Sequence, residues 1–237
     1  MKVLIFLMVI CVMLASAPAY GATQQAQANM IVRSLQSPNI SPGGQGSLTI
    51  TLFNPYNQTM QQSHLTLSIY SFSSSTVHKG MSSIPPDSRP YFVNTGGQNA
   101  TFTFTLVSGG VERFTLLIQT NYSTPHGTFF SQAVYTVSLY LSFLINGTHI
   151  RMGSKGVFTA SEWNSIFPTD PAGGSYMNYT YLNRTLGYAG ILPDISFGVN
   201  TASPLYLFIA SGSLAAFFAV VAFVSYSRHA KRRKPSG

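Results

Sequence analysis

The chain has 237 residues, 13 basic residues against 5 acidic ones, a formal net charge of +8 and a single cysteine. This length allows one domain or two small ones, and one cysteine excludes a disulfide framework within the chain. Five of the basic residues lie between Arg228 and Lys234, which leaves residues 23–203 nearly neutral. A nearly neutral body argues against electrostatic capture of DNA or RNA, so we expect no nucleic-acid partner.

The N-terminus has the residue order of a secretory signal peptide. Lys2 supplies a positive charge, an apolar run follows from Val3 to Leu14, and small residues continue to Ala22. A membrane-spanning helix needs about 20 apolar residues, and this run is too short for one. Residues 1–22 are therefore predicted to be removed after Ala19 or Ala22, and Cys11 is removed with them.

Alternating apolar and polar residues predict β-strands in the body of the chain. In the first strand Leu48, Ile50 and Leu52 share one face. The same pattern recurs, with β-branched and aromatic residues, in segments 47–53, 64–69, 101–106, 113–118 and 134–143. Asn146-Gly147 between two apolar runs predicts a two-residue hairpin turn. The sequence predicts an all-β protein, an antiparallel Ig-like β-sandwich, with a closed barrel as the alternative.

The pattern changes after Phe158. Thr159 to Glu162 matches a capping box and predicts one short helix through Trp163. Trp163 is expected to pack on the edge of the sandwich, and the alternative is an exposed platform on which a sugar stacks. These assignments give an ectodomain over residues 23–166, followed by a juxtamembrane stalk or strap over residues 167–203. The apolar residues of this second segment favour docking of part of it on the sandwich.

The C-terminal region predicts a membrane anchor. Leu205 to Tyr226 has no charged residue and is long enough to cross about 30 Å of hydrocarbon as a helix. The basic cluster that follows is typical of a cytoplasmic segment. We predict a transmembrane helix over 204–226, a cytoplasmic tail over 227–237 and an ectodomain outside the cell membrane. Small residues at Ser211, Ala215 and Ala219 raise the hypothesis of a homodimer through this helix.

Asn-x-Ser/Thr sequons are frequent in the predicted ectodomain. Each offers a side-chain amide to which a glycosyltransferase can attach an N-linked glycan. The seven predicted glycosylation sites are Asn39, Asn57, Asn99, Asn121, Asn146, Asn178 and Asn183. We expect a secreted glycoprotein in which at least some of these sites are used.

No grouping of residues in the sequence predicts catalysis. The nucleophile-elbow, metalloprotease and phosphate-loop motifs are absent, and the histidines at 64, 78, 126 and 149 are isolated. The five acidic residues show no spacing typical of a glycosidase pair. We therefore expect no enzyme activity, no cofactor and no metal site. An extracellular hydrolase is the least favoured alternative.

One part of the chain resembles a known group of proteins. Ser37-Pro38-Asn39-Ile40-Ser41-Pro42-Gly43-Gly44, followed by Leu48-Thr49-Ile50-Thr51-Leu52-Phe53-Asn54, resembles the opening of Ig-like domains on archaeal cell surfaces, of the adhesion and S-layer-associated type. The resemblance covers residues 30–145 and implies an Ig-like fold with a surface role. We expect a structural, adhesive or protein-binding protein whose partners are the lipid bilayer, N-linked glycans and surface-layer or membrane-complex proteins. The alternative is an accessory or receptor-like subunit of a membrane complex.

Overall fold

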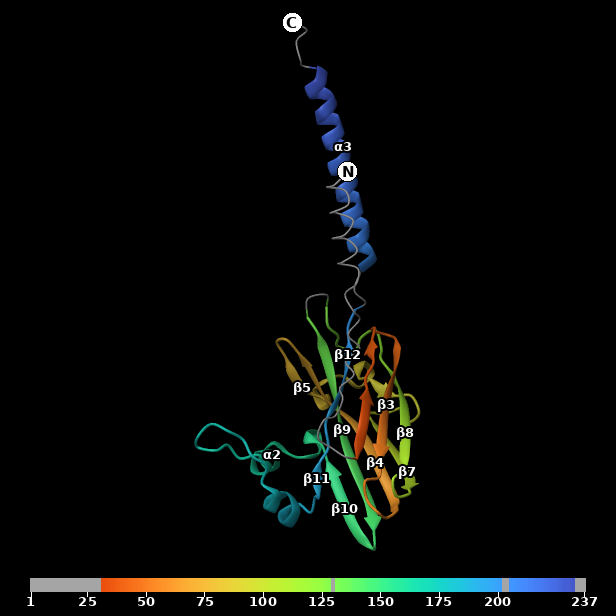
Figure 1. The fold of residues 1–237 in the computed structure, drawn as a ribbon, viewed down its shortest axis with the longest axis vertical. Coiled ribbons are helices and arrows are strands. Elements are labelled where there is room, and N and C mark those ends of the chain that lie inside the picture. Colours follow the sequence, from red (N-terminus) through yellow and green to blue (C-terminus); the bar gives the residue numbers. More distant parts are fainter. Residues whose placement is uncertain (1–30, 129–130, 202–204, 233–237) are drawn as a thin grey trace. The chain divides into compact units, whose positions relative to one another are not determined.

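The computed structural model describes residues 31–128, 131–201 and 205–232 (Figure 1). The predicted signal peptide and the last five residues of the predicted tail lie outside the described residues. The chain forms two compact units, residues 1–201 and 202–237. The first unit holds two β-sheets, and the second holds one long helix.

The first sheet has four antiparallel strands in the order β1-β3-β8-β6. The strands are β1 (Val32–Gln36), β3 (Gln45–Phe53), β8 (Val111–Gln119) and β6 (Tyr91–Phe92). The pairing of β3 with β8 is continuous from Gln45 opposite Gln119 to Phe53 opposite Val111. Because β6 pairs only with the end of β8, most of β8 has a neighbouring strand on one side alone.

The second sheet is built around its two longest strands, β4 (Met60–Ser74) and β9 (Ala133–Ile145), which pair along almost their whole length. Beyond β4 lie β7 (Asn99–Leu106) and β5 (His78–Gly80). Beyond β9 lie β10 (Thr148–Gly153) and β12 (Ile195–Val199). Two short strands pair in parallel at this margin, β11 (Gly190–Ile191) with β10 and β2 (Asn39–Ile40) with β12.

The core lies between the inward faces of the two sheets. The predicted alternation is confirmed, since Leu48, Ile50 and Leu52 are buried on β3 and Leu65 and Leu67 are buried on β4. Full burial of such a side chain contributes about 1.5–3 kcal/mol. All five predicted strands exist, and two separate sheets around one core are a sandwich rather than a closed barrel.

The predicted hairpin turn is also confirmed. Asn146 and Gly147 connect β9 to β10, with φ values of +50° and +74°. Two consecutive positive φ values are the geometry of the type I′ turn, which asparagine and glycine adopt with little strain.

Two strands of the segment that was predicted to be a stalk or strap, β11 and β12, belong to the sandwich. Residues Ile195, Phe197 and Val199 of β12 are buried, and the ring of Phe197 stacks on that of Tyr135 at 5.4 Å. The expected partial docking is therefore present within residues 167–201, and the sheet continues past residue 166 to Val199. The strand was missed because it is only five residues long, is preceded by Pro193 and contains Gly198.

Short helices fill the connections between strands. They are η1 (Met81–Ser83), η2 (Pro86–Ser88), η3 (Lys155–Val157), α2 (Ala160–Ile166) and the π-type turn η4 (Tyr181–Thr185). Three of these five lie between β10 and β12. This places most of the irregular backbone on one side of the second sheet.

The second unit is the helix α3 (Leu205–Arg232). It continues six residues past the predicted end of the membrane span at Tyr226. The structure describes the side chains of residues 211–223 and of Tyr226 within it. A search of the described residues finds no helix that combines the length and the apolar character needed to cross a membrane. The helix itself is confirmed, whereas the transmembrane assignment stays a prediction.

Candidate binding surface

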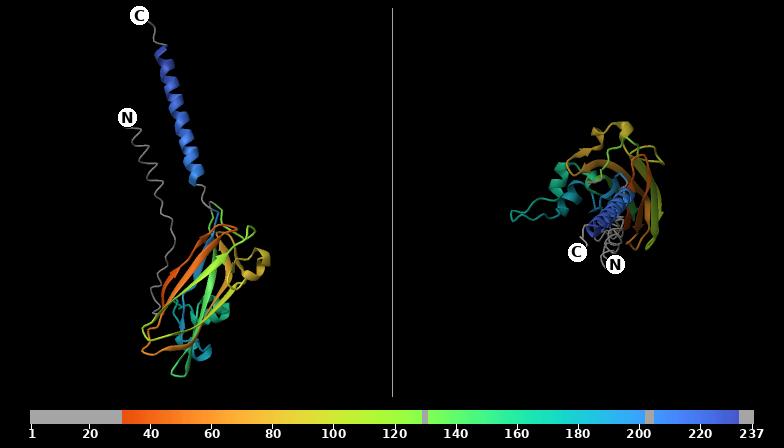
Figure 2. Two further views of the ribbon diagram at one scale, coloured as in Figure 1. Left: turned by 90° about the vertical axis from the view of Figure 1, so that its right-hand side faces the viewer. Right: turned by 90° about the horizontal axis from the view of Figure 1, so that it is seen from above.

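The irregular segment between β10 and β12, residues 154–194, forms an excursion that projects from the side of the sandwich (Figure 2). Its start is fixed by Ser154, which is fully buried. The Ser154 amide donates to the Leu139 carbonyl at 2.9 Å, and the Leu139 amide donates to Ser154 Oγ at 2.7 Å. One serine thus satisfies both backbone groups of its neighbour as the chain leaves the sheet.

The end of the excursion is fixed by Asp194. Oδ2 of Asp194 accepts a hydrogen bond from the Tyr70 hydroxyl at 3.2 Å, and Oδ1 accepts one from the Gly156 amide at 3.4 Å. The ring of Tyr70 lies against Gly156 so closely that a β-carbon at position 156 would overlap it. A glycine is therefore required where the excursion crosses Tyr70.

The helix α2 within the excursion begins with the predicted capping box. The Glu162 amide donates to Thr159 Oγ1 at 3.2 Å, and the Thr159 amide donates to Glu162 Oε2 at 2.8 Å. The two residues satisfy each other's free backbone donors, which accounts for a helix of only seven residues. The sequence therefore predicted the start of this helix correctly.

A continuous series of aromatic rings runs from β9 onto the excursion, with two cationic side chains beside it. We call this set of residues the aromatic–cationic face. Its members are Tyr140, Arg151, Lys155, Phe158, Trp163, Phe167 and Tyr188. Ring centroids are 6.2 Å apart for Tyr140–Tyr188, 4.8 Å for Tyr188–Phe158, 6.2 Å for Phe158–Trp163 and 4.5 Å for Trp163–Phe167. All five rings are half-buried, so each presents part of its surface to solvent. Such tilted and edge-to-face pairs hold the rings in fixed positions.

Two exposed cations belong to this face. The guanidinium carbon of Arg151 lies 4.6 Å from the centre of the Tyr188 ring, and Nζ of Lys155 lies 5.8 Å from that of Trp163. Nε of Arg151 also donates a hydrogen bond of 3.3 Å to the Tyr140 hydroxyl. This hydrogen bond is the main cause that raises the pKa of Arg151. Both side chains are anchored on rings and still have donors that face solvent.

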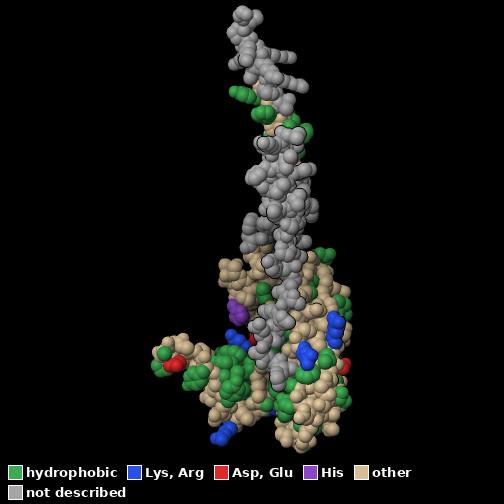
Figure 3. Space-filling view, in the orientation of Figure 1, with side chains coloured by type: hydrophobic (Ala, Val, Ile, Leu, Met, Phe, Trp, Pro, Cys, Tyr) green, Lys and Arg blue, Asp and Glu red, His purple; other side chains and the backbone are tan. Residues whose placement is uncertain are grey.

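Figure 3 shows hydrophobic side chains gathered in the region of α2, with Lys and Arg side chains close by. The turn that follows α2 adds two more tyrosines, Tyr176 at 57% exposed and Tyr179 at 68% exposed. Trp163 was predicted to pack on the sandwich edge, but Phe158 and Phe167, which it contacts, belong to the excursion. Half-buried aromatic rings beside arginine and lysine are suited to binding a protein or a sugar.

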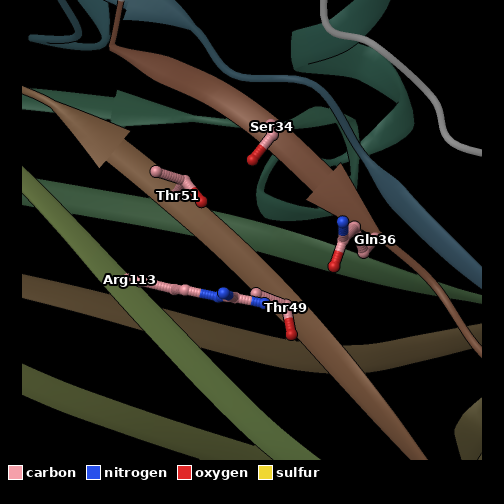
Figure 4. Close-up of a pocket in the computed structure, with 5 residues that line it drawn as sticks. All are labelled: Ser34, Gln36, Thr49, Thr51 and Arg113. Atoms are coloured by element: carbon pink, nitrogen blue, oxygen red, sulfur yellow. The ribbon is translucent and has the colours of Figure 1, made fainter.

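A second candidate is a shallow polar hollow on the outer face of the first sheet. It has a volume of about 130 Å³ and is lined by Ser34, Gln36, Thr49, Thr51 and Arg113. Figure 4 shows the Arg113 side chain reaching from β8 towards Thr49 on β3. The hollow is too small for most ligands, which occupy pockets of about 300–1,000 Å³. We therefore favour the aromatic–cationic face.

The predicted glycosylation sites are spread over the first unit and do not form a cluster. Asn39, Asn57, Asn99, Asn146 and Asn183 are exposed, whereas Asn121 and Asn178 are half-buried. Nδ2 of Asn121 donates to the Asp87 carbonyl at 2.7 Å, and Oδ1 of Asn178 accepts from the Tyr181 amide at 3.0 Å. Asn39 is exposed and also engaged, since its Oδ1 accepts a hydrogen bond of 2.9 Å from Asn200 Nδ2. The side chains of Asn39, Asn121 and Asn178 are thus held by hydrogen bonds, whereas Asn57, Asn99, Asn146 and Asn183 are simply exposed.

The acidic residues have structural contacts at three of the five positions. Glu162 caps α2, Asp194 binds Tyr70 and Gly156, and Oδ1 of Asp170 accepts from the Ala172 amide at 2.9 Å. His64 contacts the Thr103 hydroxyl. Over the described residues, no group of three or more histidine, cysteine, aspartate or glutamate side chains is arranged to hold a metal ion.

No protein-family model and no curated protein matches the sequence. Among solved structures, the seventh ScaB type I cohesin from Pseudobacteroides cellulosolvens is similar with 13% identity and a TM-score of 0.32, over 71% of this chain and 90% of the cohesin. The third ScaC cohesin from Acetivibrio cellulolyticus, solved with a ScaB dockerin, gives 14% identity and a TM-score of 0.35 over 70% and 98%.

A Nocardia farcinica protein described as having an immunoglobulin-like fold gives 14% identity and a TM-score of 0.30, over 73% of this chain and 100% of that one. At such TM-scores and identities these similarities carry no conclusion about function. The two-sheet β architecture rests on the strand pairing described above. The archaeal resemblance and the surface role remain predictions.

Proposed function

We propose that the protein is a non-enzymatic, glycosylated cell-surface protein that binds another protein through the aromatic–cationic face. The arrangement of Trp163, Phe167, Arg151 and Lys155 carries this proposal. Tryptophan, tyrosine and arginine supply a large share of the binding energy in protein interfaces. Here half-buried rings of Trp163 and Tyr188 stand on a segment that is fixed at both ends to the sheet, beside the exposed Arg151 of β10.

The rigidity of the excursion supports a binding role. Ser154 fixes its start, Asp194 fixes its end, and Thr159 caps α2. Side chains that are already ordered lose less conformational entropy when a partner binds. A cluster of rings that served only to fill space would be expected to lie in the core, yet every ring of this face retains contact with solvent.

The signal peptide and the uncharged segment Leu205–Tyr226 support display of this face outside the cell. In this proposal residues 1–22 direct secretion, Leu205–Tyr226 holds the protein in the membrane and the basic residues stay in the cytoplasm. Protease treatment of intact cells tests the orientation. Digestion of the first unit with protection of a C-terminal tag is expected, and digestion of the tag alone would contradict it.

Purification of the tagged full-length chain from native membranes in mild detergent tests the binding role. A partner should co-purify with the unsubstituted chain and be reduced at least about tenfold by Trp163→Ala, because interface residues of this kind contribute about 2 kcal/mol or more. Tyr122→Ala is the matched control, since Tyr122 is 85% exposed and lies outside the excursion.

A second function, an accessory subunit of a membrane complex, gives a different result in the same experiment. The uncharged, small-residue surface of α3 at Ser211, Ala215 and Ala219 favours this alternative, because helices pack closely there in membranes. Such a partner would remain bound to Trp163→Ala and be lost with Ala215→Leu. Loss with Trp163→Ala alone supports the aromatic–cationic face.

A further inference from the structure

Strand β7 is a long free edge of the second sheet. It pairs with β4 on one side, and no strand of the described residues pairs with its other side. It is eight residues long, whereas β2, β6 and β11 have two residues each and β5 has three. Figure 1 shows β7 at the margin of the sandwich.

The register identifies which backbone groups of β7 point outward. The Ile69 amide donates to the Gln98 carbonyl at 2.9 Å, which makes these two residues a hydrogen-bonded pair. In an antiparallel ladder such pairs alternate with pairs that are not hydrogen-bonded. The peptide groups of Phe102 and Phe104 therefore point towards β4, and those of Thr101, Thr103 and Thr105 point away from it.

The side chains agree with this assignment. Thr101 Oγ1 lies 3.1 Å from Thr66 Oγ1, and Thr103 Oγ1 lies 3.2 Å from His64 Nδ1. Side chains approach each other more closely in the pairs that are not hydrogen-bonded. The amide and carbonyl groups of Thr101, Thr103 and Thr105 thus point outward from the free edge, and no described strand forms hydrogen bonds with them.

Edge strands usually carry features that prevent pairing with another chain, such as charges, prolines or bulges. Strand β1 has Arg33 and a bulge between Val32 and Ser34, and β5 contains Lys79. Strand β8 has Glu112 and Arg113. Strand β7 reads Asn-Ala-Thr-Phe-Thr-Phe-Thr-Leu, without a charge or a proline.

We propose that β7 pairs antiparallel with β7 of a second copy of this chain, around a two-fold axis at Thr103. The segment from Thr101 to Thr105 reads Thr-Phe-Thr-Phe-Thr in both directions. A two-fold axis at Thr103 therefore places threonine opposite threonine and phenylalanine opposite phenylalanine. Such self-complementarity singles out a second copy over an unrelated strand, and the absence of charge avoids repulsion between the copies.

The pairing buries more of the Phe102 and Phe104 side chains, which share one face of the strand. Phe102 and Phe104 are half-buried, and each ring centre lies 4.9 Å from that of Phe114. In the pair, Phe102 lies opposite Phe104 of the second copy, which extends the core across the edge. Aromatic pairs across strands contribute about 0.2–1 kcal/mol each.

The predicted glycan at Asn99 is compatible with the pairing. Asn99 lies on the same face of the strand as Thr101 and Thr103, so its side chain projects from the sheet and not along the edge. Its carbonyl already accepts a hydrogen bond of 2.7 Å from the Thr95 hydroxyl. The intermolecular ladder therefore runs over Thr101, Thr103 and Thr105 and ends before Asn99.

The interface is small, which decides how it must be measured. The five paired residues Thr101–Thr105 span about 17 Å, so the buried area falls well below the roughly 1,200 Å² of stable interfaces. The pairing is therefore weak in dilute solution and depends on the high local concentration of chains in a membrane. The high local concentration rests on the proposed membrane anchoring. Because the pairing is weak, the test must trap the pair covalently.

Cysteine substitution in the full-length chain, reconstituted in vesicles under mild oxidation, tests the register. Opposed Cα atoms of a hydrogen-bonded antiparallel pair lie about 5.5 Å apart, a distance that disulfides bridge. Thr103→Cys alone should give a disulfide-linked dimer. Thr101→Cys and Thr105→Cys should each give little dimer alone and a dimer when mixed. The unsubstituted chain controls for Cys11, and Thr115→Cys, exposed on β8, controls for random collision.

Disruption of the edge provides the second arm. Thr103→Lys leaves the backbone unchanged and places a charge on the two-fold axis, and Thr103→Val is its uncharged control. Thr103→Lys is added to both the Thr101→Cys chain and the Thr105→Cys chain, and the two are mixed. The yield of disulfide-linked dimer should fall at least fivefold relative to the same mixture without Thr103→Lys. Adding Thr103→Val in the same way should leave the yield unchanged. Equal dimer yield from Thr103→Cys and Thr115→Cys overturns the proposal. Dimerisation that resists Thr103→Lys and is lost with Ala215→Leu also overturns it, because the contact would then lie in α3.

Discussion

The Tyr70 hydroxyl donates a hydrogen bond of 3.2 Å to the carboxylate of Asp194, which lies 124 positions later in the chain. The same carboxylate accepts the Gly156 amide at 3.4 Å. One acidic side chain therefore joins the central strand β4 to both ends of the excursion that carries the aromatic–cationic face. Burial, and after it the neighbouring charge of Asp194, raises the pKa of Tyr70.

Asp194→Ala is expected to destabilise the first unit by about 1–3 kcal/mol, because it leaves the Tyr70 hydroxyl and the Gly156 amide without their acceptor. Tyr70→Phe should cost less, about 1 kcal/mol, because the ring still packs on Gly156. Chemical unfolding followed by the fluorescence of Trp163, the only tryptophan, measures both. Equal stability of Asp194→Ala and the unsubstituted chain would show that this contact does not hold the excursion.

Gly156→Ala is expected to cost about 1–3 kcal/mol, since its β-carbon would overlap the Tyr70 ring and the well-packed neighbours would have to move. Gly97→Ala is the matched control, because a β-carbon there meets nothing within 4 Å and needs no positive φ. The control should lie within about 0.5 kcal/mol of the unsubstituted chain. Thermal unfolding monitored by circular dichroism compares the two variants.

Alkaline pH is expected to destabilise the sandwich through Tyr135. This side chain is fully buried, its hydroxyl donates to the Pro125 carbonyl at 2.7 Å, and burial raises its pKa above the ordinary value of 10. The unfolded state then loses a proton near pH 10 that the folded state keeps, so stability is complete below pH 10 and falls as the pH rises above it. The raised pKa of Tyr70 acts in the same direction.

Tyr135→Phe separates this titration from general alkaline effects. The variant loses the hydrogen bond to Pro125, so it should be about 1 kcal/mol less stable at neutral pH. Its stability should then decline less steeply between pH 9 and pH 11. Urea midpoints at half-unit steps of pH provide the measurement, and parallel curves for the two proteins would contradict the assignment to Tyr135.

Glycan occupancy is expected to follow the exposure of the asparagine amides when the folded chain is the acceptor. Asn57 and Asn99 are exposed, whereas Nδ2 of Asn121 is already bonded to Asp87. Peptide mass spectrometry of protein from its native membrane should show higher occupancy at Asn57 and Asn99 than at Asn121. Full occupancy of Asn121 would indicate that glycans are attached before the chain folds.

The local features of the fold could be predicted because they depend on neighbouring residues. Alternation gave the faces of β3 and β4, Asn146-Gly147 gave the hairpin, and Thr159 with Glu162 gave the start of α2. Each of these signals acts within a few positions of the chain, through side-chain direction, positive φ values or capping. Such effects hold in almost any tertiary setting.

The candidate binding surface could not be predicted in the same way. Tyr140 is far in sequence from Tyr188, and their rings meet because β11 pairs with β10 and returns the chain to the sheet. Tyr188 in turn is joined to Trp163 through Phe158. Asp194 and Tyr70 are also far apart in sequence and form their hydrogen bond only in the folded chain. The sequence pointed to Trp163 alone and left open whether it packs or binds.

What the sequence determined by itself is therefore an all-β body with a short capped helix, sequons and a long C-terminal helix, because these follow from local periodicity and composition. The tertiary structure decided that β11 and β12 belong to the sandwich, that five rings from β9 and the excursion form one face, and that no described strand pairs with the outer side of β7. The physical reason is that pairing order between strands depends on contacts across the whole chain. Those contacts leave no periodic signal at the positions that make them.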